Sequence, residues 1–354
     1  MEKIIEIDGR SGGQCLRTSL ALSSITKKPV LVFNIRANRP KKGLAQQHLT
    51  GLNTLAKISK SKVKGNFLGS DKVVFYPKKI KPGNYGVNIG TAGSITLLLQ
   101  TITLPLIFSE TKTSFRIFGG TDVPFSPCFN YSKEVFFHFL SSMGAKFSLN
   151  LKRRGYFPKG NGLISFSKIS SNLPLKPFYK VEQAELDFIK IFSHSTGFPK
   201  ETSSNLSSAA KKFLSEKIPS VGFDESIEFN EAIEEKGAGI SLVAVFRDRT
   251  RVGSSALQEK KESLKAGSLA AELLIKEIES KKPIDMHLAD QLIPFMALAK
   301  GHSTFETSSL SHHTLNNISV TEKFLDVKFE VKGKINEPVE ISVEGISFKG
   351  IQNE

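Results

Sequence analysis

The sequence has no tryptophan and only two cysteines, Cys15 and Cys128. Two thiols cannot form a disulfide framework or supply four ligands to a zinc ion, which favours a reducing compartment. Without indole rings, any stacking on nucleobases falls to phenylalanine, tyrosine, histidine or arginine. The most apolar run, residues 95–108, contains Gln100, several threonines and Pro105. It is also shorter than the ~20 residues of a membrane span.

Hydrophobic residues make up 39% of the 354 residues and charged residues 23%, so the chain can bury a large core and is not disordered. This length is ordinary for an enzyme of two domains. The first residues include Glu6 and Asp8 and do not resemble a signal peptide. We therefore expect a soluble protein with no membrane partner, located in the cytoplasm or, in a eukaryote, in the nucleus.

Acidic residues are scarce in the first half of the chain. Residues 1–180 contain 28 Lys and Arg against 7 Asp and Glu, a net charge of +21, whereas residues 181–354 contain 21 against 27, a net charge of −6. This asymmetry favours a surface for a polyanion built by the first half. The alternative is a solvated lysine-rich surface, to which the lysines between Lys57 and Lys64 would belong.

Strand-like and helix-like stretches alternate over the first 180 residues. We expect strands at residues 3–8, 29–35, 73–76, 114–118 and 146–151, and helices at residues 16–25, 43–58, 93–108 and 131–143. Units of similar length follow one another, which indicates a repeated α/β module, although no repeat of individual residues is visible.

Acidic residues become more frequent after residue 176 and glycines become fewer. In this part we expect helices at residues 202–214, 264–280 and 285–299, a strand at residues 240–246, and a closing hairpin of residues 324–331 and 339–343. We interpret residues 181–282 as a smaller α/β domain. It would be inserted into a large discontinuous domain, residues 1–180 plus 283–354.

Two segments near the N-terminus suit the binding of phosphate. Residues 8–14 form a glycine-rich turn that opens a helix, and such turns point backbone N–H groups at an anion, although an ordinary strand–helix connection has the same composition. Arg36 and Arg39 close a strand and precede Gln47-His48 on the next predicted helix. Two arginines three residues apart can grip a phosphate with both guanidinium groups, or can be an ordinary surface pair.

Two further segments combine small residues with polar or aromatic ones. Residues 82–94 contain four glycines and other small residues. Gln100 follows inside a predicted buried helix, where its amide needs a core hydrogen bond or a ligand. Residues 119–127 and 153–160 combine glycine and proline with aromatic and basic side chains. That composition suits single-stranded nucleic acid, and it equally suits a rigid turn.

The last quarter of the chain concentrates histidine. His287, Asp290 and Gln291 have the spacing of one helix face, and together they could hold a base or a ribose. Four of the seven histidines lie between His287 and His313, and their spacing fits no standard zinc motif. This density favours a functional site.

Taken in order, these segments resemble the RNA 3′-terminal phosphate cyclase family over nearly the whole chain. The residues that carry the resemblance are Glu6-Ile7-Asp8-Gly9, Gly12-Gly13-Gln14, Leu16-Arg17, Ile35-Arg36-Ala37-Asn38-Arg39, Gln47-His48-Leu49, Gly90-Thr91-Ala92-Gly93-Ser94, Gly119-Gly120-Thr121-Asp122, Arg154-Gly155-Tyr156-Phe157-Pro158-Lys159-Gly160 and His287-Leu288-Ala289-Asp290-Gln291. The resemblance implies an α/β (α+β) fold. Its large domain would repeat units of two helices on a four-stranded sheet, with a smaller α/β domain inserted.

The resemblance also implies an activity. An enzyme of this family uses ATP and a divalent cation, Mg²⁺ or Mn²⁺, to convert the 3′-phosphate end of an RNA to a 2′,3′-cyclic phosphate through a histidine–AMP adduct. The nucleophile falls on His313, in the stretch His313-Thr314-Leu315-Asn316-Asn317-Ile318, whereas His312 would point elsewhere. No obligate protein partner and no particular metal ligand can be inferred.

The remaining site residues are carried over from the family in the same way. The adenylate pocket would consist of Gln100, Pro127, His287, Leu288, Ala289, Asp290 and Gln291. The RNA end and the phosphates would be held by Arg17, Arg36, Arg39 and Gln47.

The chain departs from the family in its first loop, where Gly9 is joined to Gly12 by two residues only, and the usual glutamate near the ATP phosphates is missing. Lys42, Asn130 and Asn316 replace a usual proline, aspartate and threonine. The short loop suggests weaker metal dependence, a substitute carboxylate or lost activity.

Two alternatives to an active cyclase follow. The first is a catalytically silent relative, similar to the cyclase-like protein of ribosome assembly, which would have no need to keep His313. The second is an enolpyruvyl transferase, which explains neither His313 nor the basic first half.

Overall fold

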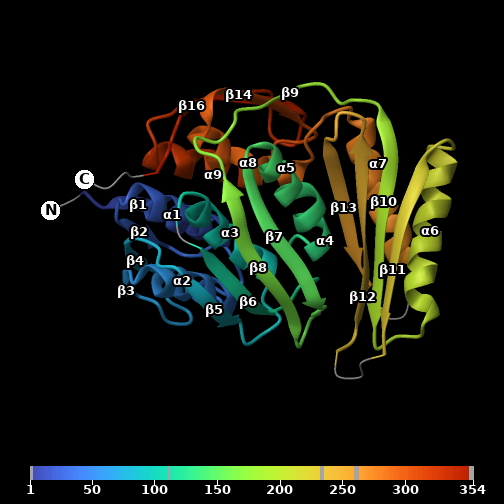
Figure 1. The fold of residues 1–354 in the computed structure, drawn as a ribbon, viewed down its shortest axis with the longest axis horizontal. Helices are drawn as coiled ribbons and strands as arrows, with labels where there is room; N and C mark the ends of the chain where they lie inside the picture. Colours follow the sequence, from blue (N-terminus) through green and yellow to red (C-terminus); the bar gives the residue numbers. More distant parts are fainter. Residues whose placement is uncertain (1–2, 111, 232–234, 259–262, 351–354) are drawn as a thin grey trace.

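The computed structural model describes residues 3–110, 112–231, 235–258 and 263–350. Within these ranges the strands form four sheets of four strands each. Three sheets make up the body of the molecule, and the fourth, from residues 186–257, stands at one end (Figure 1). In the part of the chain that the structure describes, no helix has the length and apolar character needed to cross a membrane.

The first sheet and its helices form a βαβαββ unit. Its elements in chain order are β1 (Ile5–Asp8), α1 (Gly13–Thr26), β2 (Val30–Phe33), α2 (Gln46–Ser59), β3 (Lys62–Lys64) and β4 (Val73–Tyr76). The strands lie in the order β1-β2-β4-β3, with β1 and β2 parallel and the other two pairs antiparallel. The parallel pair is joined through α1, since parallel neighbours need a long crossover connection.

Two further units repeat this arrangement. The second contains β5 (Gly83–Asn88), α3 (Ile95–Ile107), β6 (Thr113–Gly119), α4 (Phe129–Tyr131), η1 (Ser132–Phe136), α5 (Phe137–Ser142), β7 (Ala145–Arg153) and β8 (Gly162–Ser171). The third contains β9 (Tyr179–Lys180), α8 (Met286–Leu298), β14 (Lys300–Thr307), α9 (His312–Phe324), β15 (Phe329–Lys332) and β16 (Val339–Ile346). Their sheets, β5-β6-β8-β7 and β9-β14-β16-β15, match the first sheet in order and in the direction of every pair. The expected α/β fold with repeated units is confirmed.

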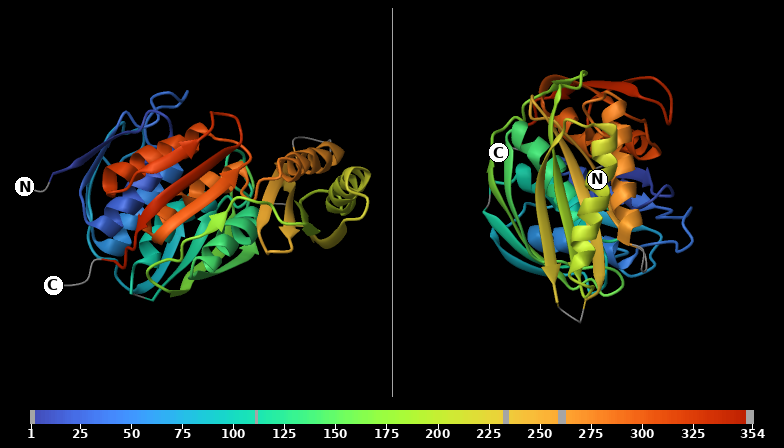
Figure 2. Two further views of the ribbon diagram at one scale, coloured as in Figure 1. Left: turned by 90° about the horizontal axis from the view of Figure 1, so that it is seen from above. Right: turned by 90° about the vertical axis from the view of Figure 1, so that its right-hand side faces the viewer.

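Between β9 and α8 the chain forms the fourth sheet with two helices, residues 186–279, here called the insert. Its elements are β10 (Leu186–Thr196), α6 (Glu201–Lys217), β11 (Gly222–Asn230), β12 (Gly237–Phe246), β13 (Arg251–Leu257) and α7 (Ser263–Glu279). The strand order is β11-β10-β12-β13. Most buried apolar side chains of the insert form a cluster of their own, whereas Val243 and Val245 of β12 belong to the apolar cluster of the body. Figure 2 shows the insert projecting from the body. The domain limits expected from the sequence stay predictions.

The first helices of the units lie inside the body, enclosed by its sheets (Figure 2). In α3 every residue except Leu97 and Gln100 is buried, and in α8 the residues that are not buried are Met286, His287 and Asp290. A helix that is apolar on nearly all sides belongs in a core. The polar exceptions in these two helices therefore mark the place where the core opens.

Some element limits expected from the sequence are wrong. Residues 43–45 form a loop rather than the start of a helix, because Gly43 adopts a φ of +74° and α2 begins only at Gln46. The strand expected over residues 324–331 begins at Phe329, because α9 continues through Phe324. The sequence analysis did not predict α9, nor the strands β3, β5, β8, β9, β10, β11, β13 and β14.

The buried guanidinium of Arg154 joins the body to the insert. It donates to Asp122 Oδ2 at 2.9 Å and Asn130 Oδ1 at 2.8 Å in the body, and to both oxygens of Glu228 on β11 at 2.9 and 3.0 Å. The side chains of Arg154 and Asp122 are 5% and 0% exposed. Because the charges of Arg154 and Asp122 are both buried, removal of either one costs more stability than it would in a surface ion pair.

We expect Arg154→Met to destabilise the protein by about 3–5 kcal/mol, since Asp122 would remain buried without its cation. Thermal unfolding followed by calorimetry measures the change. The matched control is Arg153→Met, at the exposed neighbouring position, for which a change below about 0.5 kcal/mol is expected. Equal shifts for the two variants would contradict the structural role of Arg154.

Candidate functional site

A chain of side-chain hydrogen bonds connects the first helices of the three units. Arg17 Nε on α1 donates to Gln100 Oε1 on α3 at 3.1 Å, and Gln100 Nε2 donates to Gln291 Oε1 on α8 at 3.0 Å. Gln291 Nε2 donates in turn to the carbonyl of His287 at 2.7 Å. The three linked residues stand fifth or sixth in their helices. Equivalent positions of the repeat thus meet at one point, and the amide of Gln100 is satisfied by core hydrogen bonds.

The last helix of the body is attached to the same place through Asn317. Thr18 Oγ1 on α1 donates to Asn317 Oδ1 at 2.7 Å, and Asn317 Nδ2 donates to the carbonyl of Asp290 on α8 at 2.6 Å. Asn317 is buried, whereas His312 and His313 in the first turn of α9 are exposed. The position of both histidines therefore depends on the two hydrogen bonds of Asn317.

A small cavity lies beneath this network. Its volume is about 30 Å³, enough for one or two water molecules and too small for a nucleotide. The polar part of its lining comes from Gln14, Arg17, Thr18, Gln100, Gln291 and Asn317. A nucleotide that used these side chains would have to lie on their outer side.

The N-terminus of α8 is fixed by Asp285, which the sequence analysis did not single out. Its Oδ1 accepts the N–H of His287 at 3.0 Å and the hydroxyl of Tyr131 at 2.6 Å, and its Oδ2 accepts the N–H of Gly253 on β13 at 3.1 Å. The ring of Tyr131 also meets the ring of His287 edge-on, with centroids 6.4 Å apart. Asp285 therefore joins the insert to the helix that carries His287. An aspartate directly before a predicted helix is a sequence signal for such a cap.

The charged groups around the hydrogen-bond chain influence one another. Burial raises the pKa of Asp290 from 3.8 to about 7, and the neighbouring Arg17 opposes that rise. Burial likewise lowers the pKa of Arg17 from 12.5 to about 10, against the attraction of Asp290. Arg17 stays protonated near pH 7 and Asp290 titrates there, so the local charge changes with pH.

His313 lies within the field of several cations. Partial burial lowers its pKa below the usual 6.5, and the positive charges of Arg17 and Arg39 lower it further. His287 and His312 act in the same direction. The imidazole is therefore neutral near pH 7 and keeps a lone pair for a nucleophilic reaction.

The N-terminus of α1 adjoins these cations. The imidazole of His48 packs so closely on Gly13 that a Cβ there would lie 1.9 Å from Nε2, and Arg39 lies beside Gly12. Burial, then Arg17 and Arg36, lower the pKa of His48 to about 3, so its ring is neutral. Two buried polar atoms at this end, Gln14 Oε1 and His48 Nδ1, have no hydrogen-bond partner among the residues that the structure describes. A helix N-terminus with cations beside it suits an anion.

The other residues expected in the site occupy different surroundings. Arg36 is half-buried and donates to the carbonyl of Gly43 at 2.9 Å. Gln47 Oε1 accepts the N–H of Ser94, and the Pro127 carbonyl accepts the hydroxyl of Thr96, one helical turn before Gln100. The side chains of the remaining two, Leu288 and Ala289, are fully buried in the core. The site assignments as a whole stay predictions.

Among the described residues, no three His, Cys, Asp or Glu side chains gather closely enough to hold a metal ion. In the short loop after β1, Asp8 is engaged by Arg10, whose Nε donates to it at 2.7 Å. A divalent cation at this site would therefore take most of its ligands from phosphate groups rather than from side chains.

Three βαβαββ units whose helices meet at a cluster of arginine, glutamine and neutral histidine define an α/β protein with a polar cluster that suits an anion. The sequence matches the family model described as RNA 3′-terminal phosphate cyclase from residue 8 to residue 331. The chain therefore belongs to the RNA 3′-terminal phosphate cyclase family, and the resemblance drawn from its motifs is confirmed.

Individual relatives agree with this assignment. The protein named RNA 3′-terminal phosphate cyclase from Methanosarcina barkeri is 42% identical over 336 residues, covering 94% of this chain and 97% of the relative. Proteins of the same name from Methanosarcina mazei and Methanopyrus kandleri are 40% and 37% identical over 352 and 351 residues. These cover 94% and 97% of this chain, and 97% and 99% of the relatives.

We expect Asn317→Ala to lower the free energy of unfolding by about 2 kcal/mol, because two buried hydrogen bonds are lost. Denaturant unfolding measures the loss. The matched control is Asn316→Ala, at the half-buried neighbouring position, for which a change below about 0.5 kcal/mol is expected. A similar loss in both variants would show that Asn317 does not hold α9 in place.

Proposed function

We propose that this protein converts the 3′-terminal phosphate of an RNA to a 2′,3′-cyclic phosphate with consumption of ATP. The observation that carries the proposal is the position of His313 in the first turn of α9, where partial burial and the charges of Arg17 and Arg39 lower its pKa. Membership of the family and the names of the relatives support the overall reaction. The basic first half of the chain suits an RNA substrate.

In the first step, a nitrogen of His313 attacks the α-phosphorus of ATP. A nitrogen–phosphorus bond forms, the bond from the α-phosphorus to the bridging oxygen breaks, and pyrophosphate leaves. The lowered pKa of His313 supports this role, since a protonated imidazole has no lone pair to donate. Arg17 and Arg39 would stabilise the negative charge that develops on the phosphate.

In the second step, an oxygen of the RNA 3′-phosphate attacks the phosphorus of the histidine-bound AMP. The nitrogen–phosphorus bond breaks, and His313 is regenerated. The neighbouring 2′-hydroxyl then attacks the RNA phosphorus, loses its proton and expels AMP, which closes the ring. Adenylylation is needed because AMP is a far better leaving group than an oxygen of a phosphate monoester.

The N-terminus of α1 would bind the phosphates. The phosphates would be contacted by its backbone N–H groups, by Arg36 and Arg39, and by the unpartnered Nδ1 of His48. The adenosine part would be contacted by Gln100, His287 and Gln291. A bound Mg²⁺ or Mn²⁺ would reduce the phosphate charge, held mainly by the phosphates themselves.

A catalytically silent RNA-binding relative is the second candidate, and the short loop after β1 favours it. The loop lacks the glutamate that the family usually carries there, and its carboxylate Asp8 is paired with Arg10. The two candidates differ in one measurable property. Incubation with α-labelled ATP and Mg²⁺ gives an acid-labile protein adduct only in an active cyclase.

We expect His313→Ala to abolish both the adduct and cyclisation, because the nucleophile is lost. The matched control is His312→Ala, the neighbouring exposed histidine on α9, which should keep most of both activities. Labelling with α-labelled ATP and cyclisation of a 3′-phosphorylated oligonucleotide measure the two steps. Loss of the adduct in His312→Ala but not in His313→Ala would overturn the assignment.

The rate of adenylylation should fall with acidification only below pH 6.5, because the pKa of His313 is lowered from that value. Arg39→Gln, measured at saturating ATP, should move this acidic limb toward pH 6.5, since removal of a cation raises the pKa. Lys41→Gln removes an exposed cation from the same loop and should leave the limb in place. If the rate instead falls near pH 7, and Arg39→Gln does not change that pH, the titrating group is Asp290 rather than His313.

A further inference from the structure

A second and larger cavity lies where the body meets the insert, outside the site described above. Its volume is about 460 Å³, within the range of cavities that hold small ligands. Its lining comes from three places: the loop after β6, the loop between β7 and β8, and one end of the insert with the loop after β10. The lining residues that matter below are Asp122, Pro124, Phe157, Phe198, Lys236 and Leu257. The loop after β6 and the loop between β7 and β8 are segments whose composition suits single-stranded nucleic acid.

The loop between β7 and β8 is held rigidly. The ring of Tyr156 packs on Gly237 so closely that a Cβ there would lie 2.0 Å from the ring, and its hydroxyl contacts His194 Nδ1 at 2.8 Å. The N–H of Tyr156 donates to Glu235 at 2.6 Å, and the N–H of Gly160 closes the turn on the Tyr156 carbonyl at 2.7 Å. The next side chain, Phe157, is 67% exposed at the cavity. It is therefore presented to solvent by a fixed backbone.

A second aromatic side chain is exposed in the loop after β6. Phe125 is fully exposed and adopts a φ of +61°, a conformation that is costly for a bulky residue. It follows Pro124, which lines the cavity. Folding gains almost nothing from an unburied ring, so the stability of the protein does not explain why phenylalanine stands here.

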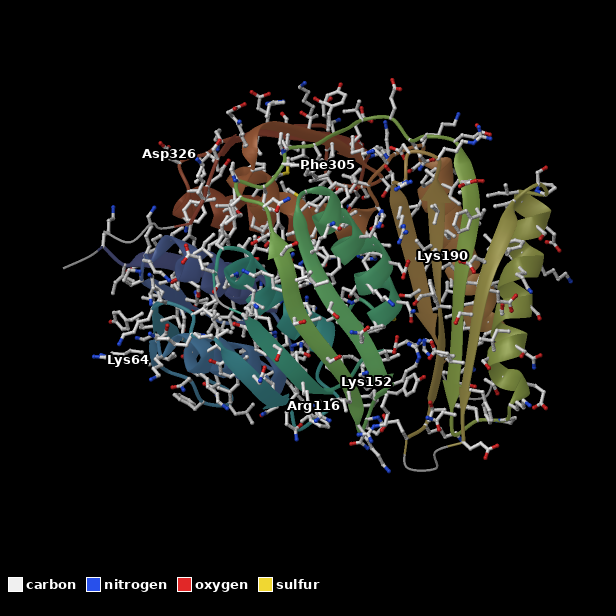
Figure 3. The ribbon with its side chains drawn as sticks, viewed as in Figure 1. Lys64, Arg116, Lys152, Lys190, Phe305 and Asp326 are labelled. Atoms are coloured by element: carbon white, nitrogen blue, oxygen red, sulfur yellow. The ribbon has the colours of Figure 1, made fainter. Side chains whose placement is uncertain are left out.

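The charges around the cavity suit a polyanion. The ammonium of Lys236 lies 4.8 Å from the ring centroid of Phe198 in the cavity wall. Lys159 is exposed on the loop that carries Phe157, and Arg153 is exposed at the end of β7. Lys152, the residue before Arg153, lies toward the insert (Figure 3). The nearby carboxylates are engaged: Asp122 by the buried Arg154, and Glu235 by backbone N–H groups.

The cavity and the site with His313 are connected by two elements. The loop after β6 runs from the cavity to Pro127, which is bonded to α3 one turn before Gln100. On β13, Gly253 contacts Asp285 at the start of α8, and Leu257, four residues further, lines the cavity. Four residues of strand span ~13 Å. This length of β13, from the contact with α8 to the cavity, equals roughly four nucleotide spacings of 3.4 Å. A strand of RNA that continues from the start of α8 can therefore reach the cavity.

We propose that this cavity binds an unpaired nucleobase of the RNA strand a few nucleotides before its 3′ end. The base would stack on Phe157 and Phe198, and Lys236 with the exposed cations of the loop would contact the backbone phosphates. This inference rests on the proposed function for the place where the 3′ end is held. It assigns the insert a part in selecting single-stranded RNA.

The test compares two substrates, uridine 3′-phosphate and a ten-residue oligouridylate with a 3′-phosphate. Phe157→Ala should lower kcat/KM for the oligonucleotide roughly tenfold or more, because a base–aromatic stack is lost. The value for uridine 3′-phosphate and the KM for ATP should stay unchanged, and Phe157→Trp should restore oligonucleotide activity. Phe67→Ala is the matched control, since Phe67 is 63% exposed after β3 in the first unit. It should leave all values unchanged.

A binding measurement separates this inference from the proposed function. Fluorescence anisotropy with an oligouridylate that ends in a hydroxyl needs no catalysis, and Phe157→Ala should weaken that binding roughly tenfold relative to Phe67→Ala. If the wild-type protein cyclises neither substrate but this binding difference appears, the proposed function fails and the RNA-binding cavity stands. Unchanged oligonucleotide binding and kcat/KM in Phe157→Ala, or an equal loss on both substrates, would overturn the cavity assignment.

Discussion

The hydrogen-bond chain from Arg17 through Gln100 to Gln291 is the constraint on which the body of this protein depends. It crosses three helices that are otherwise packed in apolar surroundings, where an unpaired amide or guanidinium costs several kcal/mol. The first helix of each βαβαββ unit must therefore have one particular rotation about its own axis and one particular depth within the body. The same constraint leaves Gln100 of α3 and His287 and Asp290 of α8 as the polar residues of these two helices that are not buried. The stability of the packing between the three units and the placement of the candidate site thus have one physical origin.

The insert is part of this arrangement, although most of its buried apolar side chains form a separate cluster. It interrupts the third unit between β9 and α8, so its end positions the first residue of α8. Asp285 bonds that helix to β13, and Arg154 bonds the loop after β7 to β11. These polar contacts act together with apolar packing, since Val243 and Val245 of β12 belong to the apolar cluster of the body. The polar contacts fix the orientation of the insert more strictly than apolar packing alone would, because hydrogen bonds are directional.

The electrostatic surroundings explain why two histidines with different roles are both neutral. His48 loses its charge mainly through burial, whereas exposed His313 also depends on the charges of Arg17 and Arg39. Cations that attract a phosphate therefore also keep the neighbouring imidazole unprotonated. One set of arginines would serve both substrate binding and activation of the nucleophile, which makes the two properties inseparable by simple mutation.

The sequence alone determined the class of fold through its periodicity, and the family through the order of its motifs, whereas the limits of the inserted acidic domain stay a prediction. It could not show that Gln100 and Gln291 share a hydrogen bond, or that Asp285 caps α8 against β13, because those partners are 191 and 32 residues apart. The threefold repeat was visible only as alternation, since its units share strand order and not side chains. Tertiary structure decided which motifs meet, because contact between distant residues depends on how helices and sheets pack.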